Sequence, residues 1–250
     1  ISDEWCRGVN CHPVYSAFCS AQPEVSASPT ASLPPTSAAP TVDPASTAAP
    51  SSDSNSRQHV GVYDWTWVSG AVTLPPAATM GVAFSGHAVV ATALSESAPL
   101  LNSLPGQKYL SLGGGNAAGH FTAARIDALN TAMANGDLAA YDGICYDIEE
   151  GDAGLAAAFE ESFEMAKTNG FLVLVTVSHS APYGFTDKIQ LMDQIFDSDH
   201  VDILSPQLYT SGSESSNDFD WDGVPWSSYS KSKTVLVPSV VEPSFYPDAE

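Results

Sequence analysis

From residue 59 onward, short apolar runs alternate with longer segments of helical period. These runs predict strands over residues 59–63, 80–84, 108–112, 143–148, 172–178, 201–208 and 234–240. The longer segments predict helices over residues 121–134, 153–169 and 186–196. Strands that alternate with helices need crossover connections, and these join parallel strands. The pattern therefore predicts an α/β fold built on a parallel sheet.

The segment 153–169 has the clearest helical pattern. Its large apolar residues recur at intervals of four, four and three positions, at Leu155, Phe159, Phe163 and Ala166. This spacing places them on one face of a helix. Gly170 follows where a helix is expected to end.

Polar and acidic residues gather where the predicted strands end, at Asp64, Trp65, 111–116, Asp147, Glu149, His179, Gln207 and Tyr209. An open doubly wound sheet is one way to arrange these strands, but no G-x-G-x-x-G opens a helix after the first of them. Functional groups at many strand ends are typical of a (β/α)8 barrel. We predict a TIM-type (β/α)8 barrel over residues 59–250. Seven strands are recognisable, and the eighth is missing, replaced from elsewhere or lost by truncation.

Residues 1–19 form a separate head that holds Cys6, Cys11 and Cys19. Such dense cysteine usage predicts disulfides and the tail of a small cysteine-rich module. Three is an odd number, so one cysteine pairs with Cys145, pairs with another chain or an upstream segment, or stays free. A zinc site that includes His12 is the alternative, although the spacing is not that of a standard finger.

Residues 20–58 are rich in Ser, Thr, Ala and Pro and almost lack large apolar side chains. Such a segment cannot bury enough surface to fold alone. Proline favours an extended chain, and the Ser/Thr density is typical of an O-glycosylated stalk. A plain flexible spacer is the alternative. Both interpretations predict a linker in an extracellular, secreted protein, and since the first residue is Ile1 we expect a processed or truncated chain.

The charge is strongly negative, with 8 Lys plus Arg against 29 Asp plus Glu and a net charge of −21. An acidic surface repels phosphate backbones and anionic lipids, which argues against nucleic acid and membrane partners. No run of about 18 apolar residues is present to span a bilayer. A neutral polysaccharide is compatible with this charge.

The stretch 141–151 carries the candidate chemistry. If residues 143–148 form a strand, Cys145, Asp147 and Glu149 share one face, and Tyr146 and Ile148 share the other. Two carboxyls this close raise the pKa of one of them, which then keeps its proton near neutral pH. A protonated acid beside an ionised one is what cleavage of a glycosidic bond needs. The alternatives are solvated acids at a strand end or a Ca²⁺ loop, although the acids lack the order of an EF-hand.

Three motifs resemble glycoside hydrolase family 18, the chitinases and their inactive relatives, in its hevamine-like branch. Residues 110–114, Leu-Ser-Leu-Gly-Gly, resemble the S-x-G-G of the third strand. Residues 142–149, Asp-Gly-Ile-Cys-Tyr-Asp-Ile-Glu, resemble the D-G-x-D-x-D-x-E of the fourth. Residues 206–209, Pro-Gln-Leu-Tyr, resemble the Q-x-Y of the sixth. The fourth-strand motif is specific, and the other two support it.

The resemblance implies hydrolysis of chitin or related N-acetylglucosamine polymers. It makes Glu149 the general acid, while the N-acetyl carbonyl of the substrate acts as nucleophile. It makes Asp147 the residue that orients the acetamide and Tyr209 the donor to the acetamide oxygen. The substrate-binding residues would be Gln207, Trp65, Ser111, Gly113, Gly114 and Asp142, with Asp142 more structural than catalytic. Further stacking on sugars, or ordinary packing, is expected of Trp67, Trp221 and Trp226.

The sequence departs from the family pattern in ways that favour a second hypothesis. Cys145 stands where the family has its middle Asp, and a thiol is a weak donor. Thr210 stands where many members have Asp or Asn, and no candidate exists for the Trp of the eighth strand. The alternative is an inactive, carbohydrate-binding or structural relative that self-associates as an assembly subunit.

Other catalytic constellations are absent from the sequence. No G-x-S-x-G nucleophile elbow occurs, and the histidines are scattered without ligand spacing. No cofactor and no metal are therefore expected. The acidic run of Asp218, Asp220 and Asp222 is expected to be a solvated loop, with a Ca²⁺ site as the minor alternative.

Overall fold

The structure of the chain, a computed structural model, describes residues 15–17, 60–67 and 78–249. The predictions of a cysteine-rich head and of an extended linker over residues 20–58 lie outside the described residues, except for the backbone of 15–17. The possible pairing or zinc ligation of Cys6, Cys11, His12 and Cys19 lies outside them as well.

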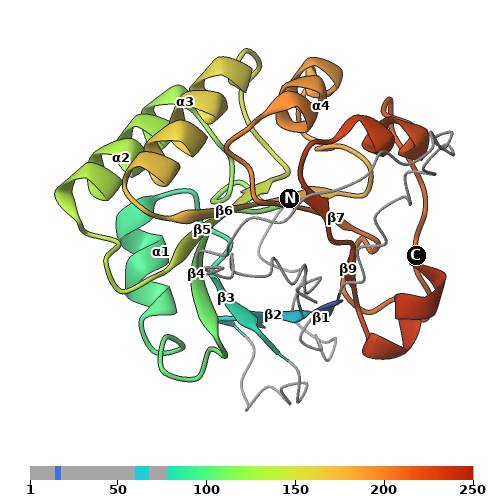
Figure 1. Ribbon diagram of the computed structural model, residues 1–250, viewed down its shortest axis with the longest axis horizontal. Helices are drawn as coiled ribbons and strands as arrows, with labels where there is room; N and C mark the ends of the chain where they lie inside the picture. Colours follow the sequence, from blue (N-terminus) through green and yellow to red (C-terminus); the bar gives the residue numbers. More distant parts are fainter. Residues whose placement is uncertain (1–14, 18–59, 68–77, 250) are drawn as a thin grey trace, which may run out of the picture. The chain divides into compact units, whose positions relative to one another are not determined.

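Parallel strands form the centre of the fold (Figure 1), and consecutive strands are neighbours. They are β2 (Val60–Trp65), β3 (Met80–Phe84), β4 (Gln107–Gly113), β5 (Gly143–Ile148), β6 (Leu172–Ser178) and β7 (Ile203–Gln207). Each pairs in parallel with the next. Parallel neighbours in chain order confirm the predicted α/β sheet and bring the carboxyl ends of all six strands to one side.

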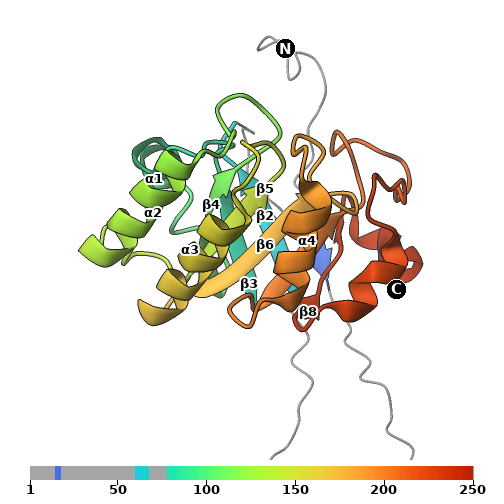
Figure 2. The same ribbon diagram turned by 90° about the horizontal axis from the view of Figure 1, so that it is seen from above.

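Helices lie against the outer face of these strands, as the two views show (Figures 1 and 2). They are α1 (Val90–Ser97), α2 (Ala123–Asn135), α3 (Ala156–Thr168) and α4 (Lys188–Asp197). The side chain of Thr122 accepts from the N–H of Arg125 to begin α2, and Gly136 ends it at φ 79°. The sequence did not predict α1. The helix has only 8 residues, and its N-cap residue, Val89, has an apolar side chain that cannot form the capping hydrogen bond that marks the start of a helix.

Helix α3 shows how the apolar spacing determines the packing. Phe159, Phe163 and Ala166 are fully buried, as the sequence predicts. The ring of Phe163 meets that of Tyr146 on β5 edge to face, with centroids 4.8 Å apart. The hydroxyl of Tyr146 lies 2.9 Å from Ser162 Oγ, so a polar contact accompanies the apolar one. The helix ends before Gly170, which adopts φ 84°.

The strand predicted over residues 234–240 is two short strands, β8 (Val235–Leu236) and β9 (Ser239–Val240). Both pair with β7 in parallel, β8 near its start and β9 at its end. Pro238 lies between them and has no N–H to donate to a ladder, which explains the break.

The strands are joined into a ring through β1 (Tyr15–Ala17), which is antiparallel to both β2 and β9. Strand β6 pairs with β7, which in turn pairs with β9, so the hydrogen-bonded neighbours lead back to the start. Strands β8 and β9 both follow β7 and together take the seventh position of the ring. Within the described residues, β1 takes the eighth position and runs in the opposite direction. The fold is thus an incomplete (β/α)8 barrel. Of the explanations offered for the eighth strand, replacement by a segment from elsewhere in the chain fits the structure.

Two apolar layers follow from the alternation of side chains along the strands. Ile144, Tyr146 and Ile148 of β5 belong to the layer between the strands and the helices. Cys145 of the same strand belongs to a second cluster inside the ring. The predicted faces of β5 are therefore confirmed, and the inner face carries the polar chemistry.

After β7 the chain forms two 3-10 helices, η1 (Trp226–Lys231) and η2 (Pro243–Asp248). No helix among the described residues is long and apolar enough to cross a bilayer.

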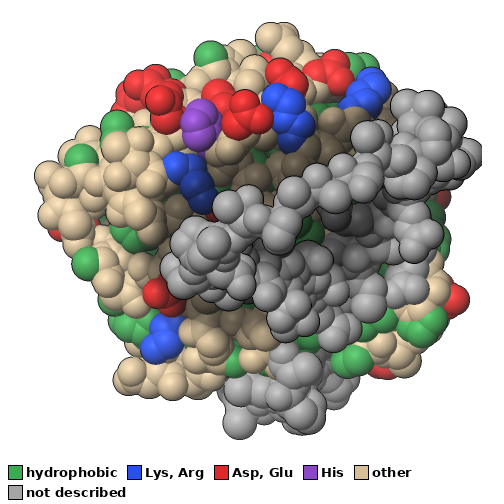
Figure 3. All heavy atoms as spheres, in the orientation of Figure 1, with side chains coloured by type: hydrophobic (Ala, Val, Ile, Leu, Met, Phe, Trp, Pro, Cys, Tyr) green, Lys and Arg blue, Asp and Glu red, His purple; other side chains and the backbone are tan. Residues whose placement is uncertain are grey.

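Figure 3 shows Asp and Glu side chains gathered on the upper rim of one face, with basic side chains among them. Ion pairs of the structure include Lys167 with Asp202 and Lys233 with Asp199.

Gly113, the last residue of β4, approaches β5 more closely than any side chain would allow. It adopts φ 106°, and a Cβ there would overlap the carbonyl oxygen of Asp147 and the ring of Phe121. By contrast, Gly136 adopts φ 79° at the end of α2 with nothing within 4 Å of a Cβ. The two glycines share a positive φ but differ in the space around them.

We expect Gly113→Ala to lower the free energy of unfolding by about 3 kcal/mol or more, because strain and overlap add. The control Gly136→Ala should cost only about 1 kcal/mol, since it meets strain alone. Urea unfolding of both variants measures the difference. Equal losses would show that β4 and β5 are not held at this distance.

Candidate active site

Two carboxyls lie at the carboxyl end of β5. Asp147 is the penultimate residue of the strand and is fully buried on its inner face. Glu149 follows one residue after the strand and is half-buried. The alternation of side chains puts both on the same side, so the strand itself brings the two acids together.

The side-chain amide of Gln207, at the end of β7, joins the two acids. Its Nε2 donates to Asp147 Oδ1 at 3.0 Å and lies 3.4 Å from Glu149 Oε1. The same nitrogen lies 3.3 Å from Thr176 Oγ1 on β6. One buried amide thus links the ends of three parallel strands, and it holds two acid oxygens within reach of a single nitrogen.

Burial raises the pKa of both acids. Burial is the first cause for Asp147, and the charge of Glu149 is the second; together they raise the pKa of Asp147 well above its ordinary value. Burial also raises the pKa of Glu149, against the opposing effects of hydrogen bonds to Asp147 and Gln207. The pair titrates as a unit and keeps a proton at a pH where an ordinary carboxyl has lost its own.

Tyr209 lies two residues beyond Gln207 and is buried with the inner cluster of the ring. Burial raises the pKa of its phenol well above the ordinary value. Nearby charges act in the same direction, first that of Tyr63 and then those of Asp147 and Glu149. The phenol therefore stays protonated beside the two acids and can donate a hydrogen bond.

The glycine run after β4 lets the backbone approach both acids. The N–H of Gly114 donates to the carbonyl oxygen of Asp147 at 3.1 Å. A Cβ on Gly114 would lie 3.4 Å from Asp147 Oδ2, and one on Gly115 would lie 2.9 Å from Glu149 Oε2. Among the described residues, Asp147 Oδ2 has no hydrogen-bond partner. One buried acid oxygen therefore faces the glycine run without a donor.

Cys145 lies one inward position below Asp147 and is a free, buried thiol. Burial, and then the charge of Asp147, raise the pKa of the thiol well above its ordinary value. Ser111 is fully buried beside it, across the register of β4 and β5. The expected inward position of Cys145 is confirmed, and a thiol that keeps its proton lies next to the pair on the inner face of β5.

Trp65, at the end of β2, is buried in the inner cluster beside Phe84. Its ring lies 5.3 Å from that of Trp67, which is 44% exposed. For Trp226 the contacts fit the packing alternative. Its Nε1 donates to the carbonyl oxygen of Phe219 at 2.7 Å, and its ring packs on Tyr229. Trp65 and Trp67 thus lie in contact at the carboxyl end of β2, while Trp226 is a packing residue.

Asp142 is not part of this cluster, which corrects its inclusion among the substrate-binding residues. It precedes β5 at the opposite end from Glu149 and is exposed. Its Oδ2 accepts from the backbone N–H of Lys108 at 2.9 Å. A cavity of about 680 Å³ lies beside Asp142, at the ends of α2 and α3 and away from the two acids. Asp142 therefore stabilises the start of β5.

Two residues of the site were not among the sequence-predicted site residues. Tyr183, after β6, places its hydroxyl 2.8 Å from Glu150 Oε1 and 2.9 Å from the carbonyl oxygen of Gly115. His179 follows β6 directly, and its charge lowers the pKa of Glu149. A histidine at a strand end is the only sequence signal for His179, and nothing in the sequence distinguishes Tyr183.

The acidic run after β7 is held by basic partners. Asp218 pairs with His179 at 3.0 Å, and Asp222 pairs with Lys188. The described residues contain no group of three His, Cys, Asp or Glu side chains arranged to hold a metal ion. The Ca²⁺ alternatives for residues 141–151 and 218–222 therefore have no ligand set in this part of the chain.

No family model matches the chain, and no curated protein matches it. The chain is similar to a solved structure from Streptomyces coelicolor described as "putative Chitinase A". The similarity has a TM-score of 0.39 and 12% sequence identity, and it covers 60% of this chain and 60% of that one. A TM-score of this size is too low to establish a relationship, so any functional conclusion depends on the geometry of the site.

Proposed function

We propose that the chain is an extracellular glycoside hydrolase that cleaves chitin or related N-acetylglucosamine polymers with retention of configuration. The single observation that carries this proposal is the Asp147–Glu149 pair, which shares the amide of Gln207 and retains a proton. The phenol of Tyr209 beside it supplies a donor for a substrate carbonyl. The three motifs that resemble glycoside hydrolase family 18 supply the assignment of roles.

In the proposed reaction, Glu149 donates its proton to the glycosidic oxygen as the bond to the anomeric carbon breaks. The acetamide carbonyl oxygen of the substrate forms a bond to that carbon, which gives a positively charged oxazolinium. Asp147 accepts the acetamide N–H and balances this charge, and Tyr209 donates to the acetamide oxygen. Water then attacks the anomeric carbon, the bond from that carbon to the acetamide oxygen breaks, and Glu149 accepts a proton from the water. The acetamide is restored, and no enzyme carboxylate bonds to the sugar.

Binding of the substrate also explains how the proton comes to lie on Glu149. In the structure, Asp147 is the more deeply buried acid, which favours its neutral form. An acetamide N–H that donates to Asp147 would favour its charged form instead. The proton of the pair would then move to Glu149, the acid that is open to solvent and to a departing sugar. Activity is expected to fall as the pH rises through the raised pKa of Glu149.

Exposed aromatic side chains support a sugar polymer as substrate. Trp67, Tyr183 and Trp221 lie on three different connections, each of which leaves the carboxyl end of a parallel strand. Such rings stack on the apolar faces of sugars. Their distribution fits a ligand longer than one sugar unit.

A second candidate is a sugar-binding or structural relative without activity. Cys145, a neutral thiol, replaces the acid that the family resemblance would place below Asp147. The antiparallel β1 also occupies the place of the strand that would carry the family tryptophan. This candidate predicts oligosaccharide binding, or self-association, without any release of product.

We expect Glu149→Gln to reduce turnover of a chromogenic chitooligosaccharide at least about 100-fold, because the general acid is lost while the shape of the site is kept. Binding of the oligosaccharide, measured by tryptophan fluorescence, should persist. The matched control is Glu160→Gln on α3, whose carboxyl pairs with His200 at 2.9 Å away from the site. Equal rates for wild type and Glu149→Gln would reject the hydrolase proposal.

We expect Asp147→Asn to abolish activity and to raise the free energy of unfolding at pH 7 by about 1–2 kcal/mol, because a buried, repelled acid is removed. The raised pKa of Asp147 means that the folded state binds more protons than the unfolded state. Stability should therefore fall as the pH rises from about 4, and the variant should remove part of this slope.

Urea unfolding of wild type and Asp147→Asn between pH 4 and pH 8 measures both effects. The control is Asp202→Asn, which removes a carboxylate that accepts from Lys167 at 2.7 Å and from the N–H of Val173 at 2.8 Å. This change should lower stability by about 1 kcal/mol. A loss of stability at pH 7 in Asp147→Asn would contradict the view that the buried, repelled carboxyl of Asp147 destabilises the folded state.

A further inference from the structure

The connection between Tyr209 and Asp222 carries two exposed aromatic side chains. Phe219 is 48% exposed and Trp221 is 59% exposed. We refer to residues 210–222 as the aromatic loop. It begins directly after the phenol of the site, so its position determines where these rings lie relative to the two acids.

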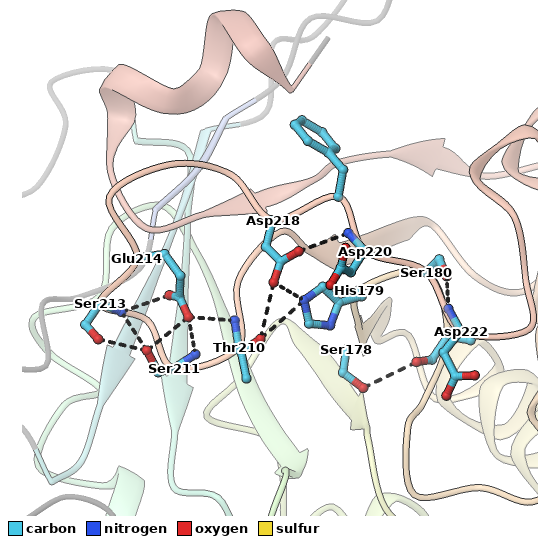
Figure 4. A network of polar contacts seen from close by, with 12 residues as sticks. Ser178, His179, Ser180, Thr210, Ser211, Ser213, Glu214, Asp218, Asp220 and Asp222 are labelled. Carbon is cyan, nitrogen blue, oxygen red and sulfur yellow. Dashed lines mark hydrogen bonds and ion pairs between the residues drawn. The ribbon is translucent and has the colours of Figure 1, made fainter.

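His179 holds the inner part of this loop (Figure 4). Its Nε2 lies 3.0 Å from Asp218 Oδ2 and 3.4 Å from Thr210 Oγ1. Thr210 Oγ1 in turn lies 3.5 Å from Asp218 Oδ2, so three side chains close a small triangle. The triangle connects the residue after β6 with two points of the aromatic loop.

Other groups also hold the loop: the N–H of Asp218 donates to the carbonyl oxygen of Leu208 at 2.9 Å, and Asn217 Nδ2 donates to that of Phe245 at 2.7 Å. Trp226 Nε1 donates to the carbonyl oxygen of Phe219 at 2.7 Å.

The remaining polar contacts act within the loop or at its outer end. Glu214 Oε1 accepts from the backbone N–H groups of Thr210 and Ser211 at 2.9 Å and 2.6 Å, which closes a local turn. At the far end, Asp222 pairs with Lys188 and its N–H donates to Ser180 Oγ at 3.4 Å. Among these contacts, the side chain of His179 is the one that links Thr210 and Asp218 to the end of β6.

The backbone of His179 adopts φ 46°, and no other non-glycine residue of the described ranges has a positive φ. This conformation costs about 1 kcal/mol for a residue with a Cβ. Glycine would avoid that cost but would lose the imidazole. The surrounding contacts maintain the strained conformation, and the imidazole thereby reaches both Thr210 and Asp218.

Charged groups from several elements face this histidine. Asp218 faces it from the aromatic loop, and Glu149 faces it from the end of β5. The backbone N–H of Asp220, and after it His179, hold the pKa of Asp218 below its ordinary value. Asp218 is thus a carboxylate with three donors, the N–H of Asp220, the imidazole of His179 and the hydroxyl of Thr210, and its charge strengthens the contact with the imidazole.

We propose that His179 is a positioning residue that fastens the aromatic loop to the end of β6 and so aligns Phe219 and Trp221 with the Asp147–Glu149 pair. A polymer that stacks on the loop is then held in register with the acids. His179 touches no reacting atom in this scheme. The benefit to catalysis rests on the proposed hydrolase function, whereas the fastening of the loop does not.

Hydrogen exchange tests the fastening without any substrate. The variant His179→Asn keeps a residue that tolerates a positive φ, but its side chain is shorter and uncharged. Asp218→Asn removes the charge from the other side. We expect each change to speed amide exchange in residues 217–222 roughly tenfold, since local opening becomes easier. The double variant should add little, because both changes break the same contact.

The control pair is His200→Gln and Glu160→Gln, which breaks a contact of 2.9 Å between α3 and the residues before β7. Exchange in residues 217–222 should stay at the wild-type rate in both. Unchanged exchange of this segment in His179→Asn would overturn the proposal, as would fully additive effects in the double variant.

Kinetics on a chitohexaose and on a short aryl disaccharide then test the alignment. We expect His179→Asn to raise KM for the hexasaccharide roughly tenfold and to change KM for the disaccharide less than twofold, because only the longer ligand reaches the loop. Equal changes for both substrates would refute the alignment. A wild-type protein that turns over neither substrate would refute the hydrolase function. Amide hydrogen exchange would still show whether His179 fastens the aromatic loop.

Discussion

The contact on which the rest of the site depends is the one between the amide of Gln207 and the two acids of β5. A buried carboxyl is costly unless a donor or a proton compensates it, and here one nitrogen serves both oxygens. This arrangement needs β5 and β7 at the correct separation, with β6 between them. The order of the parallel strands thus determines the chemistry, since Gln207 lies 60 residues from Asp147 in the sequence.

The interior of the ring is polar below this contact as well. The hydroxyl of Tyr63 lies 3.3 Å from Ser205 Oγ, and Ser205 Oγ lies 2.6 Å from Ser239 Oγ. The inner face therefore combines hydrogen-bonded hydroxyls with apolar rings, among them Trp65 and Phe84 at the carboxyl ends of β2 and β3.

The sequence predicted the parts of the molecule that depend on local periodicity. The parallel strands, the buried face of α3 and the inward direction of Cys145 follow from spacing alone. The break at Pro238, the position of β1 and the helix α1 were not predicted. Short elements of this kind carry little periodicity, and pairing with distant strands decides where they form.

In the candidate site, too, local spacing predicted some features, while contacts between distant segments decided others. The motif at residues 142–149 predicted that Asp147 and Glu149 share a face, because this is a property of one strand. It also grouped Asp142 with them, although that residue lies at the opposite end of the strand. The contacts of His179 and Tyr183 bring together segments 31 to 68 residues apart, which no spacing rule can reveal.

Strand β1 has a consequence for how the protein should be handled. It covers the backbone edges of β2 and β9 with only a few residue pairs, and residues 18–59 separate it from the rest of the barrel. A fragment that starts at residue 59 would expose two strand edges side by side. Such edges readily accept a strand from another molecule, so trimming the amino-terminal region would convert a self-contained ring into a template for chain exchange.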